Sequence, residues 1–265
     1  MKQTFTFILL CLLHTNIFPN SEPCPNTPIL PLSSTYGSTY DLSHHLAYFT
    51  ANPAIHSVAS VSHQFQTNTL QKSEGVIPNF GNTEKQYWFC FVIHNDENQY
   101  KRIITYIKYP LLDDVKFFAL RESGEIKENQ QGRRFPFENR DRDYRGFSFA
   151  SDLLPSETVT YFVGVKTDSS VSVPLMVAEE KNFDAFASLD TLLQGIYFGI
   201  VGVMTIYNLF VYFMVRDKAY IFYVLYLFIS AILFQFSLQG LLPVLFFPTH
   251  LNLYTTHITS FIFNF

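Results

Sequence analysis

The stretch TLLQGIYFGIVGVMTIYNLFVYFMV (Thr191–Val215) decides the architecture of this chain, because its 25 residues include no Asp, Glu, Lys or Arg. A three-residue turn, Arg216–Lys218, separates it from a second uncharged stretch of 31 residues, Ala219–Thr249. Each stretch exceeds the ~20 residues that an α-helix needs to cross a bilayer. The sequence therefore predicts transmembrane helices over 191–215 and 219–242, joined as an antiparallel hairpin.

Small and polar residues inside these spans predict how the helices pack. Three glycines in the first span are spaced by four and three residues, so they lie on one face of the helix. That face has no bulky side chains at these positions, which favours close approach of another helix. An asparagine in the same span needs a hydrogen-bond partner in lipid, and two glutamines in the second span are candidates for that role. The residues expected to pack helices rather than to conduct ions are Gly195, Gly199, Gly202, Asn208, Gln235 and Gln239.

The N-terminus is typical of a targeting segment. Lys2 is the first and only charge before Glu22, and Phe5–Leu13 is apolar but too short to span a bilayer. We expect residues 1–21 to be a signal peptide, with an uncleaved N-terminal anchor as the alternative. The basic turn at 216–218 favours the cytoplasmic side, and both signals place the intervening segment outside.

Residues 39–178 show the pattern of a mainly β domain. Six runs have strand length and are rich in Val, Ile, Tyr, Phe and Thr, with turn residues between them and no helix-length connections. This pattern predicts a sandwich rather than a parallel sheet. The runs are Thr83–Ile93, Ile103–Tyr109, Val115–Leu120, Gly146–Phe149, Val159–Val165 and Val173–Val177.

The fold class that follows is a mainly β, jelly-roll-like extracellular sandwich followed by α-helical transmembrane segments. Residues 22–38, rich in Pro, Ser and Thr, are expected to be a leader or linker. Asp41–Thr50 is either a first short strand or a helical turn. Residues 179–190 combine acids with spaced apolar residues, which predicts a short juxtamembrane helix that passes strain from sandwich to bundle.

The cysteine, histidine and charge content limits the disulfides, metal sites and partners that the chain can have. Only Cys24 and Cys90 follow the signal segment, so a bridge between them is open, although a buried free thiol at Cys90 is the favoured reading. No Cys/His spacing indicates a metal site, and no cofactor is expected. The net charge of −4 gives no field that would gather nucleic acid, which excludes that class of partner.

The segment 132–146 is the strongest candidate for ligand binding, because it holds five arginines, three acids and aromatic residues between two expected strands. Arginine forks suit carboxylates and phosphates and stack on aromatic rings. The candidate ligand-binding residues are Arg140, Arg142, Tyr144, Arg145 and Trp88. The competing readings are a solvated ion-pair loop for the arginines and a core position for Trp88.

Nine short sequence segments, taken together in their order along the chain, carry a family resemblance. They are Tyr109–Phe118, Arg142–Phe149, Leu154–Glu157, Tyr161–Val165, Val173–Leu175, Gly195–Gly199, Ile206–Phe210, Arg216–Tyr220 and Gln235–Gly240. In this order they resemble the bacterial seven-transmembrane receptors with diverse intracellular signalling modules (7TMR-DISM), with the type 2 extracellular domain. The resemblance implies a carbohydrate-binding-like jelly roll, a seven-helix bundle and a cytoplasmic output module such as a diguanylate cyclase or histidine kinase.

The chain departs from that pattern at its C-terminal end. Leu251–Phe265 is apolar, but its fifteen residues span only about 22 Å as a helix, so a third helix is expected to begin over 250–265, in a truncated bundle. No output-module motif occurs, and no catalytic residue is assigned. The chain is therefore expected not to be an enzyme, since nucleophile elbows, metal-ligand helices and phosphate loops are missing.

The leading functional hypothesis is a multi-pass sensory receptor of the bacterial inner membrane with its N-terminal domain in the periplasm. Its expected partners are membrane lipid and a small extracellular ligand, with a homodimer as an open alternative. A membrane-anchored carbohydrate-adhesion or assembly module without signalling is the competing hypothesis. A hydrolase is the third and weakest.

Overall fold

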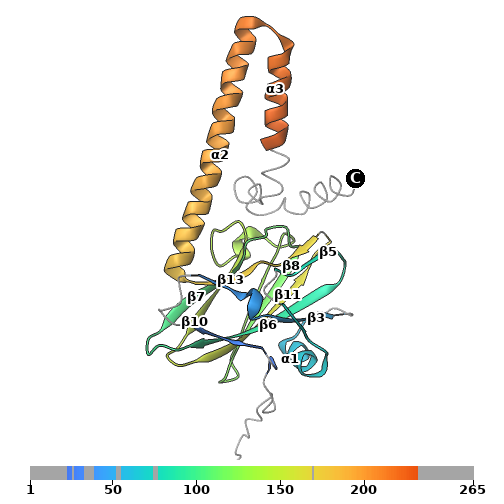
Figure 1. Ribbon diagram of the computed structural model, residues 1–265, viewed down its shortest axis with the longest axis vertical. Coiled ribbons are helices and arrows are strands. Elements are labelled where there is room, and N and C mark those ends of the chain that lie inside the picture. The colour runs from blue at the N-terminus through green and yellow to red at the C-terminus, as the bar shows by residue number, and fades with distance from the viewer. Residues whose placement is uncertain are drawn as a thin grey trace, which may run out of the picture.

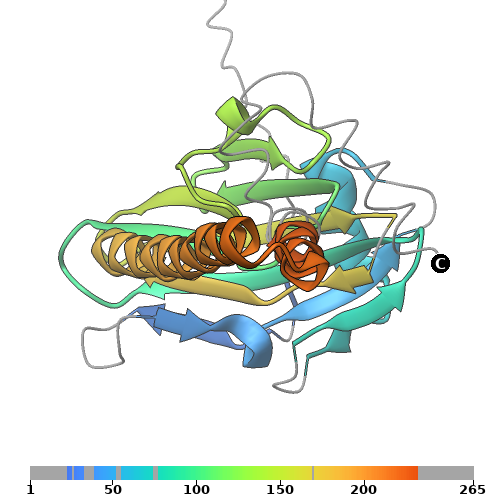
Figure 2. The ribbon, with the colours of Figure 1, turned by 90° about the horizontal axis from the view of Figure 1, so that it is seen from above.

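The computed structural model describes residues 23–25, 27–32, 39–51, 55–73, 77–168 and 170–231. One long helix leaves a β domain, and a shorter helix turns back beside it to form an antiparallel hairpin (Figure 1). Seen along the hairpin, the helices stand over one side of the β domain (Figure 2). The predicted class, a mainly β extracellular domain followed by apolar helices, is confirmed.

Eleven of the thirteen strands lie in two sheets. The larger sheet has the order β4-β3-β6-β11-β8-β9, with β1 pairing parallel to β6, and the smaller has the order β10-β7-β13-β2. The strands are β1 (Ile29–Leu32), β2 (Thr39–Asp41), β3 (Ala47–Ala51), β4 (Gln71–Lys72), β5 (Asn79–Asn82), β6 (Gln86–Asn95), β7 (Lys101–Ile107), β8 (Asp114–Arg121), β9 (Ile126–Gln131), β10 (Phe147–Leu153), β11 (Thr158–Lys166), β12 (Ser170–Ser172) and β13 (Leu175–Glu179). Strands β12 and β5 form a separate pair.

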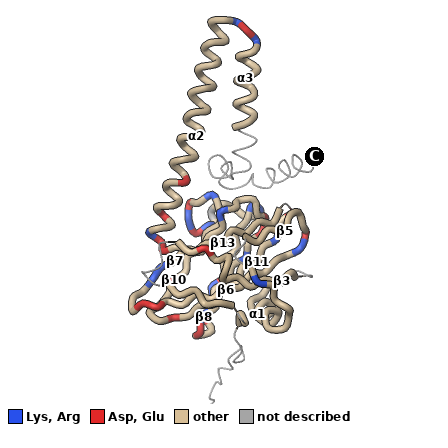
Figure 3. Tube along the Cα trace, viewed as in Figure 1, with Lys and Arg blue, Asp and Glu red and all other residues tan. Residues whose placement is uncertain are grey.

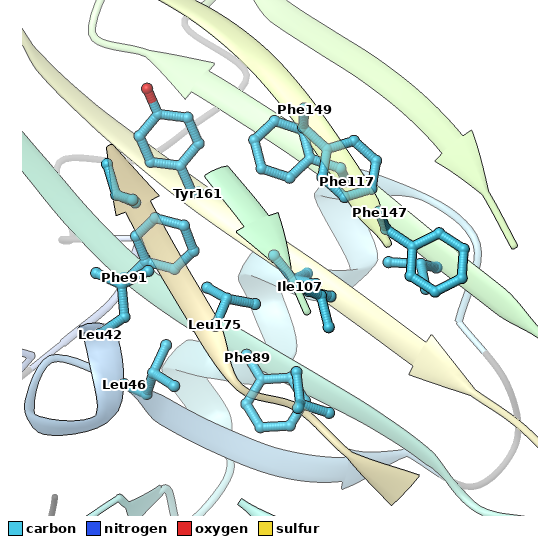
Figure 4. Packing of buried hydrophobic residues seen from close by; sticks show 14 of the residues in the cluster. Leu42, Leu46, Phe89, Phe91, Ile107, Phe117, Phe147, Phe149, Tyr161 and Leu175 are labelled. Atoms are coloured by element: carbon cyan, nitrogen blue, oxygen red, sulfur yellow. The ribbon is translucent and has the colours of Figure 1, made fainter. Parts of the chain in front are cut away.

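The core lies between the two sheets, as expected for a sandwich. Alternate residues of β6 and β8 point into it, including Phe89, Phe91 and Phe117. Phe117 of the larger sheet stacks on Phe149 of the smaller one, with ring centroids 4.5 Å apart (Figure 4). Such aromatic packing supplies most of the burial that holds the layers together.

All six predicted strands are present, with ends that differ by a few residues. The segment 41–50 contains both alternatives that the sequence left open, because β2 ends at Asp41, a 3₁₀ turn (Leu42–His44) follows, and β3 begins at Ala47. Strand β9 was not predicted. Its sequence is mostly polar because it is an edge strand with exposed side chains.

The expectation of a leader or linker over 22–38 needs correction for the part that the structure describes. Leu30 and Leu32 of β1 are buried in the main core, and Cys24 forms a disulfide with Cys90 of β6, with Cα atoms 6.1 Å apart. The favoured reading of Cys90 as a free core thiol is therefore wrong. The low apolar content of residues 22–38 predicted a linker, but two buried leucines and one disulfide are enough to hold a short strand in place.

A helix that the sequence analysis did not anticipate covers the outer face of the larger sheet. Helix α1 (Val58–Thr67) starts at the N-cap Ser57, whose hydroxyl accepts from the Ser60 N–H at 3.3 Å. Its buried residues include Phe65, which contacts Phe49 and Phe162 edge-on or tilted. This layer encloses a second apolar cluster, which contains Trp88.

Asp113 ties three loop segments together and should make the domain acid-sensitive. Its carboxylate accepts from Arg133 Nη2 (2.9 Å), the Thr167 hydroxyl (3.0 Å) and the Asp168 N–H (2.9 Å). Burial alone raises the pKa of Asp113, but these donors and the Arg133 charge outweigh it, so the pKa lies below the ordinary 3.8.

A carboxyl with a lowered folded-state pKa stabilises the fold fully above its unfolded pKa, and this stability is lost as the pH falls through the folded pKa. We expect Asp113→Asn to lower the free energy of unfolding at pH 7 by about 2 kcal/mol and to flatten its decline below about pH 4. Thermal unfolding at pH 7 and pH 3 measures both effects. An equally steep acid decline in the variant would contradict this role.

The helical hairpin contains the first predicted span, 191–215, and the start of the second, whose residues 232–242 lie outside the described residues. Helix α2 (Glu180–Val215) has 36 residues, and it is the one helix in the described part of the chain that is long and apolar enough to cross a membrane. Arg216 ends it with a positive φ of 58°, and the Asp217 carboxylate caps α3 (Lys218–Ile229) by accepting from the Ala219 N–H at 2.9 Å. Beyond Asp190, the described part of the hairpin is uncharged apart from this turn (Figure 3).

The predicted packing residues of the spans stay predictions. No described atom would contact a Cβ at the three glycines, so their face is open in the described chain. Asn208 is buried, and its amide donates to the Met204 carbonyl of its own helix at 2.8 Å. Gln235, Gln239 and the expected third helix lie outside the described residues.

Candidate functional site

The base of α2 packs against the outer face of the smaller sheet. A short juxtamembrane helix was predicted over 179–190. Glu179 ends β13, and 180–190 are the first three turns of α2, which continues into the membrane span without a break. An aromatic cluster joins the two parts. Phe183 of α2 lies 5.0 Å from Tyr106 of β7 and 5.2 Å from Tyr144, measured between ring centroids, in edge-on geometry.

The other members of this cluster are Ile104, Ala150, Ala178, Met176, Phe186 and Ala187. Phe183 is 1% exposed, whereas nearly all of the membrane-spanning part of α2 is open. Each aromatic pair contributes roughly 0.5–1.5 kcal/mol beyond its area burial. The sandwich therefore holds the helix through a packed interface and not only through the peptide bond at 179–180.

The segment 132–146 runs between β9 and β10 and forms the side of this interface. Glycines mark both of its ends for steric reasons. At Gly132, with φ of 153°, a Cβ would lie 2.1 Å from the Asp113 carbonyl oxygen, and at Gly146 a Cβ would lie 2.5 Å from the Tyr144 ring. Any other residue there would push the segment away from the sandwich.

Arg140 holds the segment in shape from inside. Its Nη1 donates to the carbonyl oxygens of Tyr144, Arg145 and Gly146 at 2.8, 2.8 and 2.9 Å. The guanidinium also lies over the Phe137 and Phe147 rings, at 4.6 and 5.0 Å from their centroids. Burial lowers the pKa of Arg140 to about 10, so the group stays charged at neutral pH and its donors are used internally.

Two arginines of the same segment point outward to acids on α2. Arg145 binds Asp190 in a bidentate pair, with Nε to Oδ2 at 2.6 Å and Nη2 to Oδ1 at 3.0 Å. Arg142 bonds to Asp184 at 2.7 Å and also contacts Glu180. The side chains of Arg145 and Asp190 are only 16% and 17% exposed, so this pair is shielded better than the Asp184 pair.

Strand β7 supplies further cations to the base of the helix. Lys101 bonds to Glu179 at 3.0 Å and to Glu97 at 3.0 Å, and Lys108 lies 4.7 Å above the Phe186 ring. We call Lys101, Lys108, Arg142, Arg145 and their partners on residues 179–190 the junction. The two arginines of the junction lie on the sandwich and the acids that they bind lie on α2, whereas the Lys101 partner Glu179 ends β13.

Tyr144 sits at the centre of the junction. It is buried, and its hydroxyl has no hydrogen-bond partner in the part of the chain that the structure describes. Burial raises the pKa of Tyr144 well above its usual value, while the Arg145 charge lowers it and Asp190 raises it. An unsatisfied buried hydroxyl costs free energy.

The structure gathers four of the five predicted ligand-binding residues at one place, although as an interface with α2. The expected ligand contacts of Arg140, Arg142 and Arg145 are filled by backbone carbonyls and helix carboxylates. Trp88 does not belong to this site. It is fully buried and stacks on Phe118, so its indole cannot serve as a platform for a ligand in this structure.

Sequence reasoning missed the partners of the arginines. The acids at 180, 184 and 190 and the apolar residues at 183, 186 and 187 were read as parts of a helix, but nothing in a single sequence pairs them with 142 and 145. Their spacing of three and four residues, which places them on adjoining helix faces, was the available signal. No group of acidic, His and Cys residues suited to a metal ion occurs in the described residues.

Comparisons with known proteins agree with this architecture. A family model described as 7TMR-DISM extracellular 2 matches residues 43–179, and a model described as 7TM diverse intracellular signalling matches residues 190–265. The chain belongs to the 7TMR-DISM family. The boundary between the two matches falls within the first turns of α2, at the junction. The 7TMR-DISM chain thus has the architecture of a receptor, a membrane protein with an extracellular N-terminal domain.

Other comparisons add little to the 7TMR-DISM assignment. No curated protein matches the sequence. Among solved structures, the chain is similar to an exo-β-1,3-galactanase from Phanerochaete chrysosporium crystallised with β-1,3-galactotriose, at 11% identity and a TM-score of 0.21. The match covers 38% of this chain and 25% of that one, so the 7TMR-DISM chain spans about a quarter of its length. A likeness of this size carries no argument about fold or activity.

Proposed function

We propose that this chain is the sensory part of a multi-pass receptor of the bacterial inner membrane. In this proposal the periplasmic sandwich binds a small ligand, and α2 carries the resulting change across the bilayer towards a cytoplasmic output module, such as a diguanylate cyclase or histidine kinase. The chain itself has no catalytic role in the proposal.

One observation supports this proposal above the others, namely that α2 is a single helix from Glu180 to Val215 whose first three turns are fixed to the sandwich. A helix of 36 residues is about 54 Å long. Because helices are stiff over such lengths, a tilt or shift imposed at the junction moves the whole transmembrane span. A purely adhesive domain would need only a tether.

The ion pairs at the junction give a ligand something to act on. A ligand shifts the equilibrium between two arrangements only by as much as it binds one better than the other. Ion pairs at half-exposed positions such as Arg142–Asp184 contribute little each, so modest binding energy suffices to exchange them. The unsatisfied Tyr144 hydroxyl marks where a second arrangement would gain a hydrogen bond.

A flexible insertion tests transmission. We expect insertion of Gly-Ser-Gly-Ser after Asp184 to abolish the response of the full-length receptor to extracellular medium, because the sandwich and the span would then move independently. A reporter of the output module, together with the amount of protein in the membrane, measures this. The matched control is the same insertion in the exposed turn between Ser123 and Gly124, which should leave the response intact.

An unchanged response after the Asp184 insertion would exclude transmission through α2. It would favour the competing hypothesis, a carbohydrate-adhesion or assembly module that the helices merely anchor.

A further inference from the structure

A buried lysine lies on the outer face of the larger sheet, away from the junction. Lys116 of β8 is 7% exposed, and its Nζ donates to Nδ1 of His56 at 2.6 Å. His56 is exposed, so the pair is open to solvent from one side. The two groups come from segments 60 residues apart in sequence and meet where the chain enters α1.

The ammonium of Lys116 has no counter-charge in the described chain. Its hydrogen-bond partner is an imidazole, and no ion pair joins it to a carboxylate among the residues that the structure describes. Asp114, on the same face of β8, accepts from the Gln130 amide at 2.7 Å instead. Burying an unpaired charge is costly, whereas the other buried lysine, Lys101, has two carboxylate partners.

The position of His56 is fixed by the sheet beneath it. Gln86 of β6 is buried, and its side-chain amide bonds both backbone groups of Ile55, accepting from the N–H at 2.8 Å and donating to the carbonyl at 3.3 Å. Ser57, the next residue after His56, is the N-cap of the ten-residue helix α1. The positive end of that helix therefore lies next to the pair and adds to its attraction for anions.

Residues of β11 and β6 lie beside Lys116 on the same sheet. Gly164 of β11 lies opposite Lys116 in register, and Trp88 lies opposite Gly164 on β6. A Cβ at Gly164 would lie 2.6 Å from the Trp88 ring, so the indole fills the space above the glycine. The residue beside Lys116 on β11 therefore has no side chain of its own, and the Trp88 ring lies over it.

We propose that Lys116 and His56 bind the carboxylate of a small periplasmic ligand. The Lys116 ammonium supplies the charge. His56 accepts from that ammonium at Nδ1, so its ring proton is on Nε2, and Nε2–H supplies a second hydrogen bond to the ligand. The start of α1 supplies positive potential. A carboxylate suits one ammonium and one imidazole, while tight phosphate sites need more donors, commonly arginine forks. This inference rests on the proposed receptor function, since it places the sensed ligand and names its class.

Binding to the full chain in lipid nanodiscs tests the inference without any signalling readout. The probes are acetate, succinate and citrate at constant ionic strength, with inorganic phosphate as the competing anion, and titration calorimetry is the measurement. We expect saturable binding of at least one carboxylate and a loss of affinity of roughly tenfold or more in Lys116→Gln. The matched control Lys85→Gln, at an exposed lysine, should bind as the wild type does.

Each other outcome overturns the inference: no carboxylate binds, phosphate alone binds, or Lys116→Gln binds equally well. The unfolding temperature of Lys116→Met without probe gives a second check. An uncompensated ammonium predicts that this variant is as stable as the wild type or more stable, and a clear fall would show that Lys116 serves only the fold. Loss of signalling with intact carboxylate binding would count against transmission through α2 and not against this site.

Discussion

Replacing Arg140 with methionine is expected to lower the unfolding temperature of the β domain by roughly 10 °C. The substitution leaves the carbonyls of Tyr144, Arg145 and Gly146 without their common donor in a partly buried segment. Unsatisfied buried polar groups cost about 1–3 kcal/mol each, and the sandwich regains only part of this through an apolar side chain. About 3 kcal/mol corresponds to the stated shift for a domain of this size.

Two variants separate this effect from loss of charge. Arg140→Lys keeps a cation but is shorter and loses the planar guanidinium that lies over the Phe137 and Phe147 rings, so it should recover less than half of the lost stability. Arg134→Met is the matched control, because Arg134 pairs with Asp168 at an exposed position of the same segment. Differential scanning fluorimetry compares them. If Arg140→Met unfolds at the temperature of Arg134→Met, Arg140 does not hold the segment.

The main strands were predictable because local pattern and tertiary role agree there. β6, β8 and β11 are central strands buried on both faces, so their sequences are continuous runs of aromatic and branched residues. The strands at the edges of the larger sheet and near the N-terminus could not be predicted from such local patterns. β9 is an exposed polar edge, and β1 depends on a pairing with β6 across more than 50 residues and on a disulfide.

At the junction, too, local features were predictable from the sequence and contacts between distant residues were not. The arginine-rich segment stood out in the sequence, since five arginines between two strands rarely serve a simple turn. Its partners could not be found, because Arg145 and Asp190 are 45 residues apart and each is locally explicable. Lys116 was overlooked for the opposite reason: a lysine at the start of a strand looks solvated until the strand is placed under α1.

The pair Arg145–Asp190 should carry the largest single electrostatic contribution at the junction. Both side chains are mostly shielded, the geometry is bidentate, and Asp190 immediately precedes the uncharged span, where the membrane surface lowers the local dielectric further. Removing one partner leaves the other charge half-buried and unpaired. We therefore expect Arg145→Met and Asp190→Asn to destabilise the docking of α2 by about 2–3 kcal/mol each.

A double-mutant cycle isolates this contribution from packing. If the two charges act mainly on each other, the variant carrying both substitutions should be closer to the wild type than the sum of the single variants, with a coupling energy of about 1–2 kcal/mol. Hydrogen exchange of the backbone amides at 180–190, measured in nanodiscs, reports directly on whether α2 is docked. Detachment would expose this part of the helix to solvent while the span stays in lipid. The exposed pair Arg142–Asp184 provides the matched cycle, for which a coupling below about 1 kcal/mol is expected. Equal coupling in the two cycles would mean that shielding near the membrane does not strengthen the Arg145 pair, and the aromatic cluster around Phe183 would then have to carry the connection between sandwich and span alone.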